Sequence, residues 1–330
     1  MNAAIVGIAG PVLSEAEAAL FRAHPPAGVI LFGRNIESPG QLVALVASLR
    51  GVLAADAVLM VDQEGGRVAR LRPPHWPAQP PAAAIGRLHA NDAAKGVRAA
   101  WLAGAVIGLE CAAAGFDVVT APVLDLRMAG ASGVIGDRAF AEDPEAVGAL
   151  GAAMAEGLLA AGVQPVGKHI PGHGRAVADS HLELPRVDTA NLEADFRPFA
   201  MNARLPWAMT AHVLYTALDP ERPATLSPAV IGPIIRQRIG FDGVLVSDDL
   251  AMGALSGAAA ARAAAALAAG CDLALYCTGD AEATAAVLSA CQNVTPVALA
   301  RMRAARDLVR SCRRDLDAPA LAAERDALLA

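Results

Sequence analysis

The sequence predicts an α/β protein built as a single (β/α)8 barrel with additional C-terminal helices. Eight short apolar runs recur along its 330 residues, and helical segments lie between them. Ionisable residues follow several of these runs directly. Apolar runs without polar alternation are typical of parallel strands that are covered on both faces. Eight such strands are the number that closes a barrel.

The eight predicted strands are rich in Val, Ile and Leu. They are Ala4–Ile8, Val29–Phe32, Ala57–Val61, Val118–Val123, Gln164–Gly167, Trp207–Thr210, Val244–Val246 and Leu273–Tyr276. A doubly wound sheet is the alternative, but no GxGxxG motif follows the first run. The Pro-rich patch Arg72–Pro81 indicates a long loop after the third strand. No Pro- or Ser-rich linker divides the chain, which favours one barrel over two domains.

The predicted helices begin at residues that commonly cap helix N-termini, as Ser14 and Ser38 illustrate. Asp143 starts an Asp-Pro-Glu sequence of the same kind, and Gly270 is suited to end a helix as its C-cap. The predicted ranges are Ser14–Ala23, Ser38–Leu49, Asp92–Ala114, Asp143–Ala161, Ser227–Arg238, Gly257–Ala269 and Asp280–Cys291.

The C-terminal part of the chain has a different pattern. Beyond about Asn293 no further strand is predicted, and a helix over Val297–Arg313 is followed by an Ala-rich tail. We therefore expect residues 1–292 to form the catalytic barrel. We expect residues 293–330 to form a helical extension that packs on the outside of the barrel.

Composition excludes several classes of protein. A hydrophobic content of 55% excludes a disordered chain, and a net charge of −6 argues against a nucleic-acid partner. With 4% aromatic residues, the core must pack mainly Ala, Val, Leu and Ile. The N-terminus lacks the basic region of a signal peptide, and the apolar stretch Gly257–Gly270 is too short to span a membrane.

The five cysteines, Cys111, Cys271, Cys277, Cys291 and Cys312, contain no CxxC pair. This pattern favours buried free thiols over a disulfide framework or a zinc site. Free thiols suit a reducing compartment. We therefore expect a cytoplasmic protein with no membrane partner.

Ionisable residues cluster just after the predicted strands. In a parallel barrel these positions lie on the C-terminal face, where barrel active sites are found. The cluster therefore predicts a catalytic pocket. Its members, in strand order, are Asp62, Glu64, Arg67 and Arg70, then Asp125, Asp137 and Arg138, then Lys168, His169, His173, Asp179 and His181, then His212, and finally Ser247, Asp248 and Asp249.

Two of the acidic positions leave alternatives open. Asp248 follows a strand directly and could be a nucleophile or a cap for the next helix. Asp249 is the better cap candidate because it is nearer the expected helix start, so we favour a catalytic role for Asp248. Glu64 precedes two glycines and could bind a ligand, or could accept hydrogen bonds from backbone amides in a tight turn.

The basic residues and histidines point to ligand binding and proton transfer. Arg70 and Arg138 offer forks of donors, and Lys168 and His169 follow an apolar run in which an unpaired charge would be costly. In an extended loop the Asp179 and His181 side chains can point the same way, which suits an acid–base pair.

A metal site is the competing interpretation of the histidines. His169, His173, His181 and Asp62 could gather as ligands, but no HxH or HExxH spacing supports this. We therefore expect neither a metal nor a cofactor.

The combined motifs resemble the bacterial β-N-acetylhexosaminidases of glycoside hydrolase family 3, of the single-barrel, cytoplasmic type that acts in cell-wall recycling. The resemblance covers most of the barrel, roughly from the first predicted strand to the eighth. The segments that carry it are Val61–Val68 (VDQEGGRV), Ala121–Asp125 (APVLD), Ile135–Phe140 (IGDRAF), Gly167–His181 (GKHIPGHGRAVADSH) and Val246–Met252 (VSDDLAM).

The resemblance implies a role for each matching position. Asp248 would be the nucleophile of a covalent glycosyl–enzyme intermediate, and His181 the general acid/base with Asp179 as its partner. The residues that would hold the sugar are Asp62, Arg70, Arg138, Lys168 and His169. Ile170 stands where the family usually has Phe, which keeps the position apolar.

The resemblance also implies a substrate. The expected reaction removes non-reducing terminal GlcNAc from peptidoglycan-derived muropeptides, GlcNAc-1,6-anhydroMurNAc with or without peptide, in a monomeric protein. A family 3 β-glucosidase is one alternative, although such enzymes generally take their acid/base from a second domain. A non-catalytic sugar-binding barrel and a metal-dependent amidohydrolase are the others.

Overall fold

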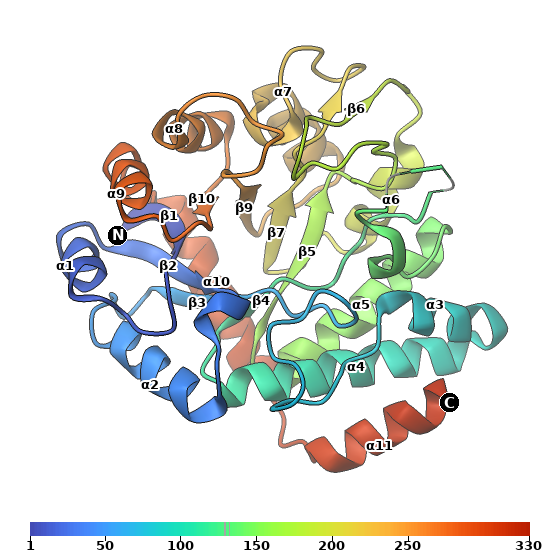
Figure 1. The fold of residues 1–330 in the computed structure, drawn as a ribbon. Coiled ribbons are helices and arrows are strands. Elements are labelled where there is room, and N and C mark those ends of the chain that lie inside the picture. The colour runs from blue at the N-terminus through green and yellow to red at the C-terminus, as the bar shows by residue number, and fades with distance from the viewer. Residues whose placement is uncertain (129, 132) are drawn as a thin grey trace.

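The computed structural model describes residues 1–128, 130–131 and 133–330. Eight parallel strands close a barrel in the order β1-β10-β9-β7-β5-β4-β3-β2 (Figure 1). This confirms the predicted fold class, because each predicted run overlaps one barrel strand. The strands are β1 Asn2–Gly7, β2 Pro26–Leu31, β3 Val58–Val61, β4 Val118–Val119, β5 Gln164–Ile170, β7 Trp207–Thr210, β9 Val244–Asp249 and β10 Leu273–Tyr276.

Two barrel strands run further than predicted at their carboxyl ends. β5 continues to Ile170 and β9 to Asp249. The added residues are Lys168, His169 and Ile170 in β5 and Ser247, Asp248 and Asp249 in β9. All of them except Ile170 are charged or polar, so the apolar run ends before the hydrogen-bonded ladder does. Two more strands, β6 (Arg186–Val187) and β8 (Leu214–Tyr215), form a separate two-stranded sheet. At two residues each, they are too short to show any periodicity.

Alternate residues of each strand face opposite sides of the barrel wall. Ile5 and Met60 belong to the cluster that fills the barrel interior, whereas Ala4 and Leu59 belong to the cluster between the strands and the helices. Trp207 also lies inside the barrel, and its Nε1 donates to Gln164 Oε1 at 2.8 Å. This pairing satisfies the polar atom of a fully buried indole.

Helices surround the barrel. Eight predicted helices are present: α1 Glu15–Ala23, α2 Pro39–Arg50, α4 Ala93–Ala113, α5 Pro144–Ala161, α7 Pro228–Val230 continuing as the π-helix η4 Ile231–Arg238, α8 Ala259–Ala269, α9 Ala281–Ala290 and α10 Pro296–Cys312. The side chains of Ser14, Ser38 and Asp143 accept the expected capping hydrogen bonds. Gly270 ends α8 in the left-handed conformation.

Two helices were not predicted, α3 Ala82–Asn91 and α6 Glu193–Met201, whereas α11 Ala318–Leu329 lies in the tail that was expected to be helical. Pro81 and Leu192 precede α3 and α6 and supply no side-chain cap, and Pro198 lies inside α6. Such helices lack the usual start signals and depend on packing. Three short 3-10 turns complete the fold: η1 Gly33–Asn35, η2 Gly136–Arg138 and η3 Ala224–Leu226.

Helices α4 and α5 pack closely because glycines line their contact. A Cβ at Gly104 would lie 2.0 Å from the carbonyl oxygen of Met154, and one at Gly157 would lie 2.1 Å from that of Trp101. By length and composition α4 is also apolar enough to cross a membrane, but it packs against α3, α5 and α11, and 61% of its apolar window is buried. A buried helix in the core of a protein meets the same criteria of length and composition.

The C-terminal helices contact different parts of the barrel. Met302 and Ala305 of α10 join the interior cluster, so α10 closes the amino-terminal end of the barrel. Helix α11 lies along α4, as Figure 1 shows. The predicted division into residues 1–292 and 293–330 stays a prediction.

Candidate active site

A pocket of about 640 Å³ opens at the carboxyl ends of the barrel strands. All eight residues assigned a role from the resemblance line it: Asp62, Arg70, Arg138, Lys168, His169, Asp179, His181 and Asp248. Phe32 is the sole Phe, Tyr or Trp among the described residues of the lining. The pocket therefore presents mainly charged and hydrogen-bonding groups to a ligand.

Asp62 and Lys168 form the first charged pair of the pocket. Lys168 Nζ lies 3.5 Å from Asp62 Oδ1 and donates to Thr120 Oγ1 at 2.9 Å, while the Thr120 hydroxyl donates to Asp62. Arg70 Nη2 donates to Asp62 Oδ2 at 2.8 Å. Burial would raise the pKa of Asp62, but the charges of Lys168 and Arg70 hold it well below its ordinary value. Asp62 is therefore an anion at neutral pH.

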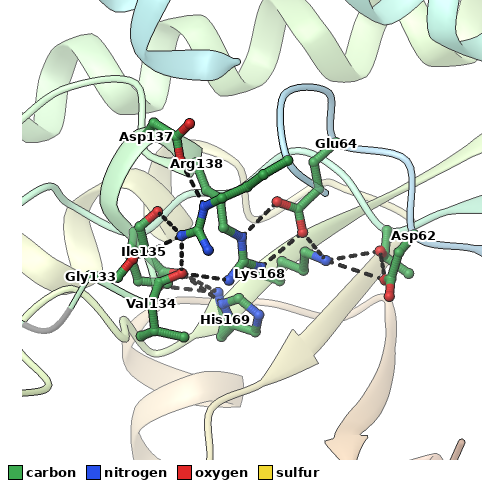
Figure 2. Close-up of polar contacts among 12 residues, drawn as sticks. Asp62, Glu64, Gly133, Val134, Ile135, Asp137, Arg138, Lys168 and His169 are labelled. Atoms are coloured by element: carbon green, nitrogen blue, oxygen red, sulfur yellow. Dashed lines mark hydrogen bonds and ion pairs between the residues drawn. The ribbon is translucent and has the colours of Figure 1, made fainter. Parts of the chain in front are cut away.

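Glu64 forms the second charged cluster, with Lys168 and Arg138 (Figure 2). Its Oε1 lies 2.5 Å from Lys168 Nζ, and Arg138 holds both carboxylate oxygens at 2.8 Å through Nε and Nη2. Burial would raise the pKa of Glu64, but these two cations lower it. The alternative that Glu64 only binds turn amides is wrong, because its carboxylate pairs with charged side chains.

A neighbouring ion pair ties two loops together at the pocket mouth. Arg67 Nε donates to Asp137 Oδ1 at 2.9 Å, and its Nη2 also donates to the backbone carbonyls of Gly133, Val134 and Ile135. Figure 2 shows Gly133, Val134 and Ile135 lying next to one another beside Asp137. The described part of the loop after β4 is thereby fixed to the loop after β3.

His169 is oriented by a buried carboxylate. Its Nδ1 lies 2.7 Å from Asp125 Oδ2, and Asp125 Oδ1 accepts the backbone N–H of His173 at 2.6 Å. Asp125 is fully buried, and burial would raise its pKa, but His169 and His173 lower it. An anionic Asp125 holds the proton of His169 on Nδ1 and leaves Nε2 as the free ring nitrogen.

Asp248 lies at the end of β9, on the pocket wall. Its Oδ1 accepts the backbone N–H of Asp249 at 2.8 Å. Burial would raise the pKa of Asp248, but the neighbouring His169, the hydrogen bond from the Asp249 backbone and the charge of Lys168 lower it below its ordinary value. A carboxylate that is ionised and placed in a pocket can act as a nucleophile.

The expectation that Asp249 caps the next helix is wrong. Helix α8 begins ten residues further on, at Ala259. Asp249 Oδ1 instead accepts the backbone N–H groups of Ala251 and Cys277, at 3.0 and 3.1 Å. Asp249 therefore joins the end of β9 to the segment that follows β10.

The buried side chain of His212 forms a hydrogen bond with the backbone at the end of β9. His212 Nε2 donates to the carbonyl oxygen of Asp249 at 2.9 Å, and Nδ1 lies 2.7 Å from Thr225 Oγ1. Burial lowers the pKa of His212, so its ring is neutral at pH 7. His212, a member of the predicted cluster, thus holds the backbone of the residue that follows Asp248.

Asp179 and His181 form a pair in the loop between β5 and β6. Asp179 Oδ1 accepts the His181 backbone N–H at 2.9 Å and lies 2.7 Å from His181 Nδ1. Burial would raise the pKa of Asp179, but its hydrogen bonds with His181 lower it. The predicted side-by-side arrangement of these two side chains is therefore present, with Nε2 of His181 free to exchange a proton.

Two supporting residues were missed from the sequence. Thr120 bridges Asp62 and Lys168, and Ser180 lies against His173. A threonine after a strand and a serine within a loop carry no distinctive signal, because both are common there for other reasons. Within the described residues no three His, Cys, Asp or Glu side chains are arranged to hold a metal ion.

The barrel and its pocket place the protein among the (β/α)8-barrel enzymes, with ionised acids and an Asp–His pair on the C-terminal face. The sequence profile described as glycosyl hydrolase family 3 N terminal domain matches residues 7–311. The chain belongs to glycosyl hydrolase family 3.

Individual relatives agree with this assignment. The β-hexosaminidase of Methylococcus capsulatus (strain ATCC 33009 / NCIMB 11132 / Bath) is 45% identical over 332 residues, covering 98% of this chain and 93% of the relative. The structure is similar to that of NagZ from Neisseria gonorrhoeae in complex with N-trifluoroacetyl-D-glucosamine. That comparison has a TM-score of 0.88 and 31% identity, and covers 100% of this chain and 98% of that one.

A second solved structure is the family 3 β-N-acetylglucosaminidase from Paenibacillus sp. str. FPU-7, with a TM-score of 0.81 and 32% identity. The match covers 99% of this chain and 62% of that protein. The longer relative therefore contains a region that this chain does not match.

Proposed function

We propose that the protein is a retaining exo-β-N-acetylglucosaminidase, a β-hexosaminidase that removes terminal GlcNAc from the non-reducing end of its substrate. The observation that carries the proposal is the shared pocket of Asp248 and the Asp179–His181 pair. It combines an ionised carboxylate with a histidine whose proton position is set by a second carboxylate. The names of the relatives support the sugar class.

The first step forms a covalent intermediate. A carboxylate oxygen of Asp248 attacks the anomeric carbon, and the bond to the leaving oxygen breaks. His181 Nε2 gives its proton to that oxygen, so the leaving group departs as a neutral alcohol. A histidine suits this task because its protonated form places no second negative charge beside Asp248.

The second step reverses the proton transfer. His181 Nε2, now unprotonated, takes a proton from water, and the water oxygen attacks the anomeric carbon. The bond to Asp248 breaks and its carboxylate is regenerated. Two displacements at the same carbon retain its configuration. Asp179 stabilises the positive charge of the His181 ring in the protonated state.

The charged residues of the pocket hold the sugar. Asp62 and the unprotonated Nε2 of His169 accept hydrogen bonds from hydroxyl groups, while Arg70, Arg138 and Lys168 donate to sugar oxygens. Their pairing with Asp62, Glu64 and Asp125 fixes these side chains before the substrate arrives. Fixed donors lose little conformational entropy on binding.

The natural substrate in this proposal is a muropeptide, GlcNAc-1,6-anhydroMurNAc with or without peptide, and the setting is cell-wall recycling in the cytoplasm by a monomer. The motif resemblance supports the substrate. The absence of disulfides among the described cysteines agrees with a reducing compartment.

The test uses Asp248→Ala and a slow 2-fluoro sugar that traps the intermediate. Asp248→Ala is expected to lose nearly all turnover of the p-nitrophenyl β-GlcNAc substrate, and the label should be found on Asp248. Asp315→Ala, which removes an exposed carboxylate far from the pocket, serves as the control and should keep wild-type turnover. Turnover that survives in Asp248→Ala, or a label elsewhere, contradicts the mechanism.

Substrate choice is tested by comparing p-nitrophenyl β-glycosides of GlcNAc, GalNAc and glucose, with and without phosphate. We expect GlcNAc to be preferred over glucose. A clear preference for glucose would support the β-glucosidase alternative and reject the proposed substrate. Faster turnover with phosphate would show phosphorolysis as the second step.

A further inference from the structure

The loop that carries the proposed acid/base is largely open to solvent. The side chains of His181 and Asp179 are 61% and 38% exposed. Two apolar residues of the same loop, Val177 and Leu182, are 70% and 78% exposed. Neither burial of His181 nor apolar packing of these two side chains therefore fixes its position. Specific anchors must hold the loop at the pocket.

The first anchor is the side chain between the two members of the pair. Ser180 is 3% exposed, and its Oγ lies 3.0 Å from His173 Nε2. His173 is itself 2% exposed, and its backbone N–H donates to the buried Asp125. Burial lowers the pKa of His173 to about 4, so its ring is neutral at the pH of the reaction. Ser180 is thus hydrogen-bonded to a buried neutral group just after β5.

The second anchor is formed by backbone groups of the loop that follows Asp248. Gly253 N–H donates to the carbonyl oxygen of His181 at 3.1 Å, and Ala254 N–H donates to that of Ser180 at 3.1 Å. A Cβ at position 253 would lie 2.7 Å from the carbonyl oxygens of both His181 and Leu182. Only glycine permits this approach, because a Cβ would collide with these carbonyl oxygens. The backbone of Gly253 is not left-handed, so its conformation alone does not require glycine.

These contacts join the two halves of the proposed machinery. The loop after β9 begins two residues beyond the proposed nucleophile, and the loop after β5 carries the proposed acid/base. We propose that Ser180, His173 and Gly253 are positioning residues, and that with Ala254 they form a clasp that holds the Asp179–His181 pair at the pocket. This inference rests on the proposed function for its chemistry, and on the geometry alone for the clasp.

The clasp predicts a loss that depends on the leaving group. A phenyl glycoside needs a proton on its leaving oxygen, whereas an activated dinitrophenyl glycoside does not. In Ser180→Ala and Gly253→Ala we expect kcat/KM for phenyl β-GlcNAc to fall at least about tenfold, since acid–base catalysis contributes roughly 10²–10⁴. For the dinitrophenyl glycoside kcat/KM should fall by less than about threefold.

Matched controls separate the clasp from general damage. Ser256→Ala removes an exposed hydroxyl from the same loop as Gly253, and Gly232→Ala adds a methyl group where no atom lies within 4 Å. Both should keep wild-type kcat/KM on both glycosides. The clasp is contradicted if Ser180→Ala and Gly253→Ala lower kcat/KM by the same factor for the two glycosides. It is also contradicted if neither variant lowers kcat/KM.

A second measurement tests the clasp without any reference to catalysis. Arg175 and Arg186 flank the pair and offer trypsin sites in or beside the loop. Ser180→Ala and Gly253→Ala should be cut there several-fold faster than wild type at unchanged Tm, and the controls should not. If His181→Ala lowers kcat/KM for the two glycosides by the same factor, the proposed acid/base role is contradicted. The clasp is then judged by cleavage alone, where faster cutting supports it and an unchanged rate rejects it.

Discussion

Asp62, Glu64 and Lys168 show how charged side chains stay ionised inside a folded protein. Lys168 is 3% exposed, and an unpaired buried ammonium would be expelled or neutralised. Two carboxylates and the Thr120 hydroxyl surround it instead. The same pairing holds the carboxylates in their charged forms, ready to accept hydrogen bonds. Electrostatic fit thus prepares the pocket before a sugar binds.

Glu64→Gln tests this fit at a single residue. The change leaves Arg138 without its charged partner and leaves Lys168 with Asp62 alone, and breaking a buried ion pair costs about 3–5 kcal/mol. We expect a lower Tm and about a tenfold higher KM for p-nitrophenyl β-GlcNAc, equivalent to roughly 1.4 kcal/mol of lost binding. Steady-state kinetics and thermal unfolding measure the two effects.

Glu145→Gln provides the matched control for Glu64. Glu145 pairs with Arg197 at 2.6 Å, but both side chains are more than half exposed. Surface pairs contribute about 0–1 kcal/mol, so this variant should match wild type in KM and nearly in Tm. An unchanged KM in Glu64→Gln would show that the pairing does not prepare the site.

Close helix packing illustrates the element scale. With few aromatic residues, the core depends on the approach of small side chains, and α4 against α5 is the clearest case. Gly104 and Gly157 lie where backbone carbonyls of the facing helix leave no room for a methyl group. Glycine weakens an isolated helix, so its presence here is explained by the contact between the helices.

Two glycine-to-alanine variants separate propensity from packing. Gly104→Ala should lower the free energy of unfolding by about 1–3 kcal/mol, because the added methyl group overlaps the Met154 carbonyl. Gly40→Ala, in α2 where nothing lies within 4 Å, should raise it by up to about 1 kcal/mol. Urea unfolding measures both. Equal shifts in the two variants would contradict a packing role for Gly104.

At the scale of the whole molecule, the C-terminal helix joins parts of the chain that are far apart in sequence. Arg325 of α11 is 3% exposed and donates to Gln79 Oε1 at 2.5 Å. Gln79 Nε2 donates to Glu110 Oε1 of α4 at 2.8 Å, and the Gln79 carbonyl accepts the N–H of Gly66 beside Glu64. Helix α11 thus supports the loop that carries Asp62 and Glu64.

This contact makes stability depend on pH through Glu110. Burial raises its pKa from an ordinary 4.5 to about 7, and its Oε2 is buried without a partner among the described groups. The folded state therefore binds the proton more tightly than the unfolded state. The stabilisation is complete below about pH 4.5 and is lost as the pH rises through about 7.

Glu110→Gln should remove this part of the pH dependence, because an amide stays neutral. We expect its Tm to exceed that of wild type at pH 8 and the difference to vanish near pH 4.5. Glu156→Gln, which changes an exposed carboxylate on α5, should follow the wild-type profile. Parallel profiles for Glu110→Gln and wild type would reject a buried, proton-binding Glu110.

Much of the fold could be predicted because its signals are local. Apolar runs marked all eight barrel strands, and Ser14, Ser38 and Asp143 marked helix starts. Helices α3 and α6 were not predicted because no capping side chain precedes them. The site residues were predicted as a set because parallel strands end on one face. Asp249 was misjudged because the helix expected after it begins only at Ala259.

The sequence by itself determined the barrel, the face on which its chemistry lies and the residues that gather there. These follow from periodicity and strand order, which neighbouring residues encode. Only the tertiary structure decided which charges pair, that Glu64 meets Lys168 and Arg138, and that Gly253 leaves room for His181. Such contacts join residues tens to hundreds of positions apart, and their energies depend on distance and burial, which exist only once the chain has folded.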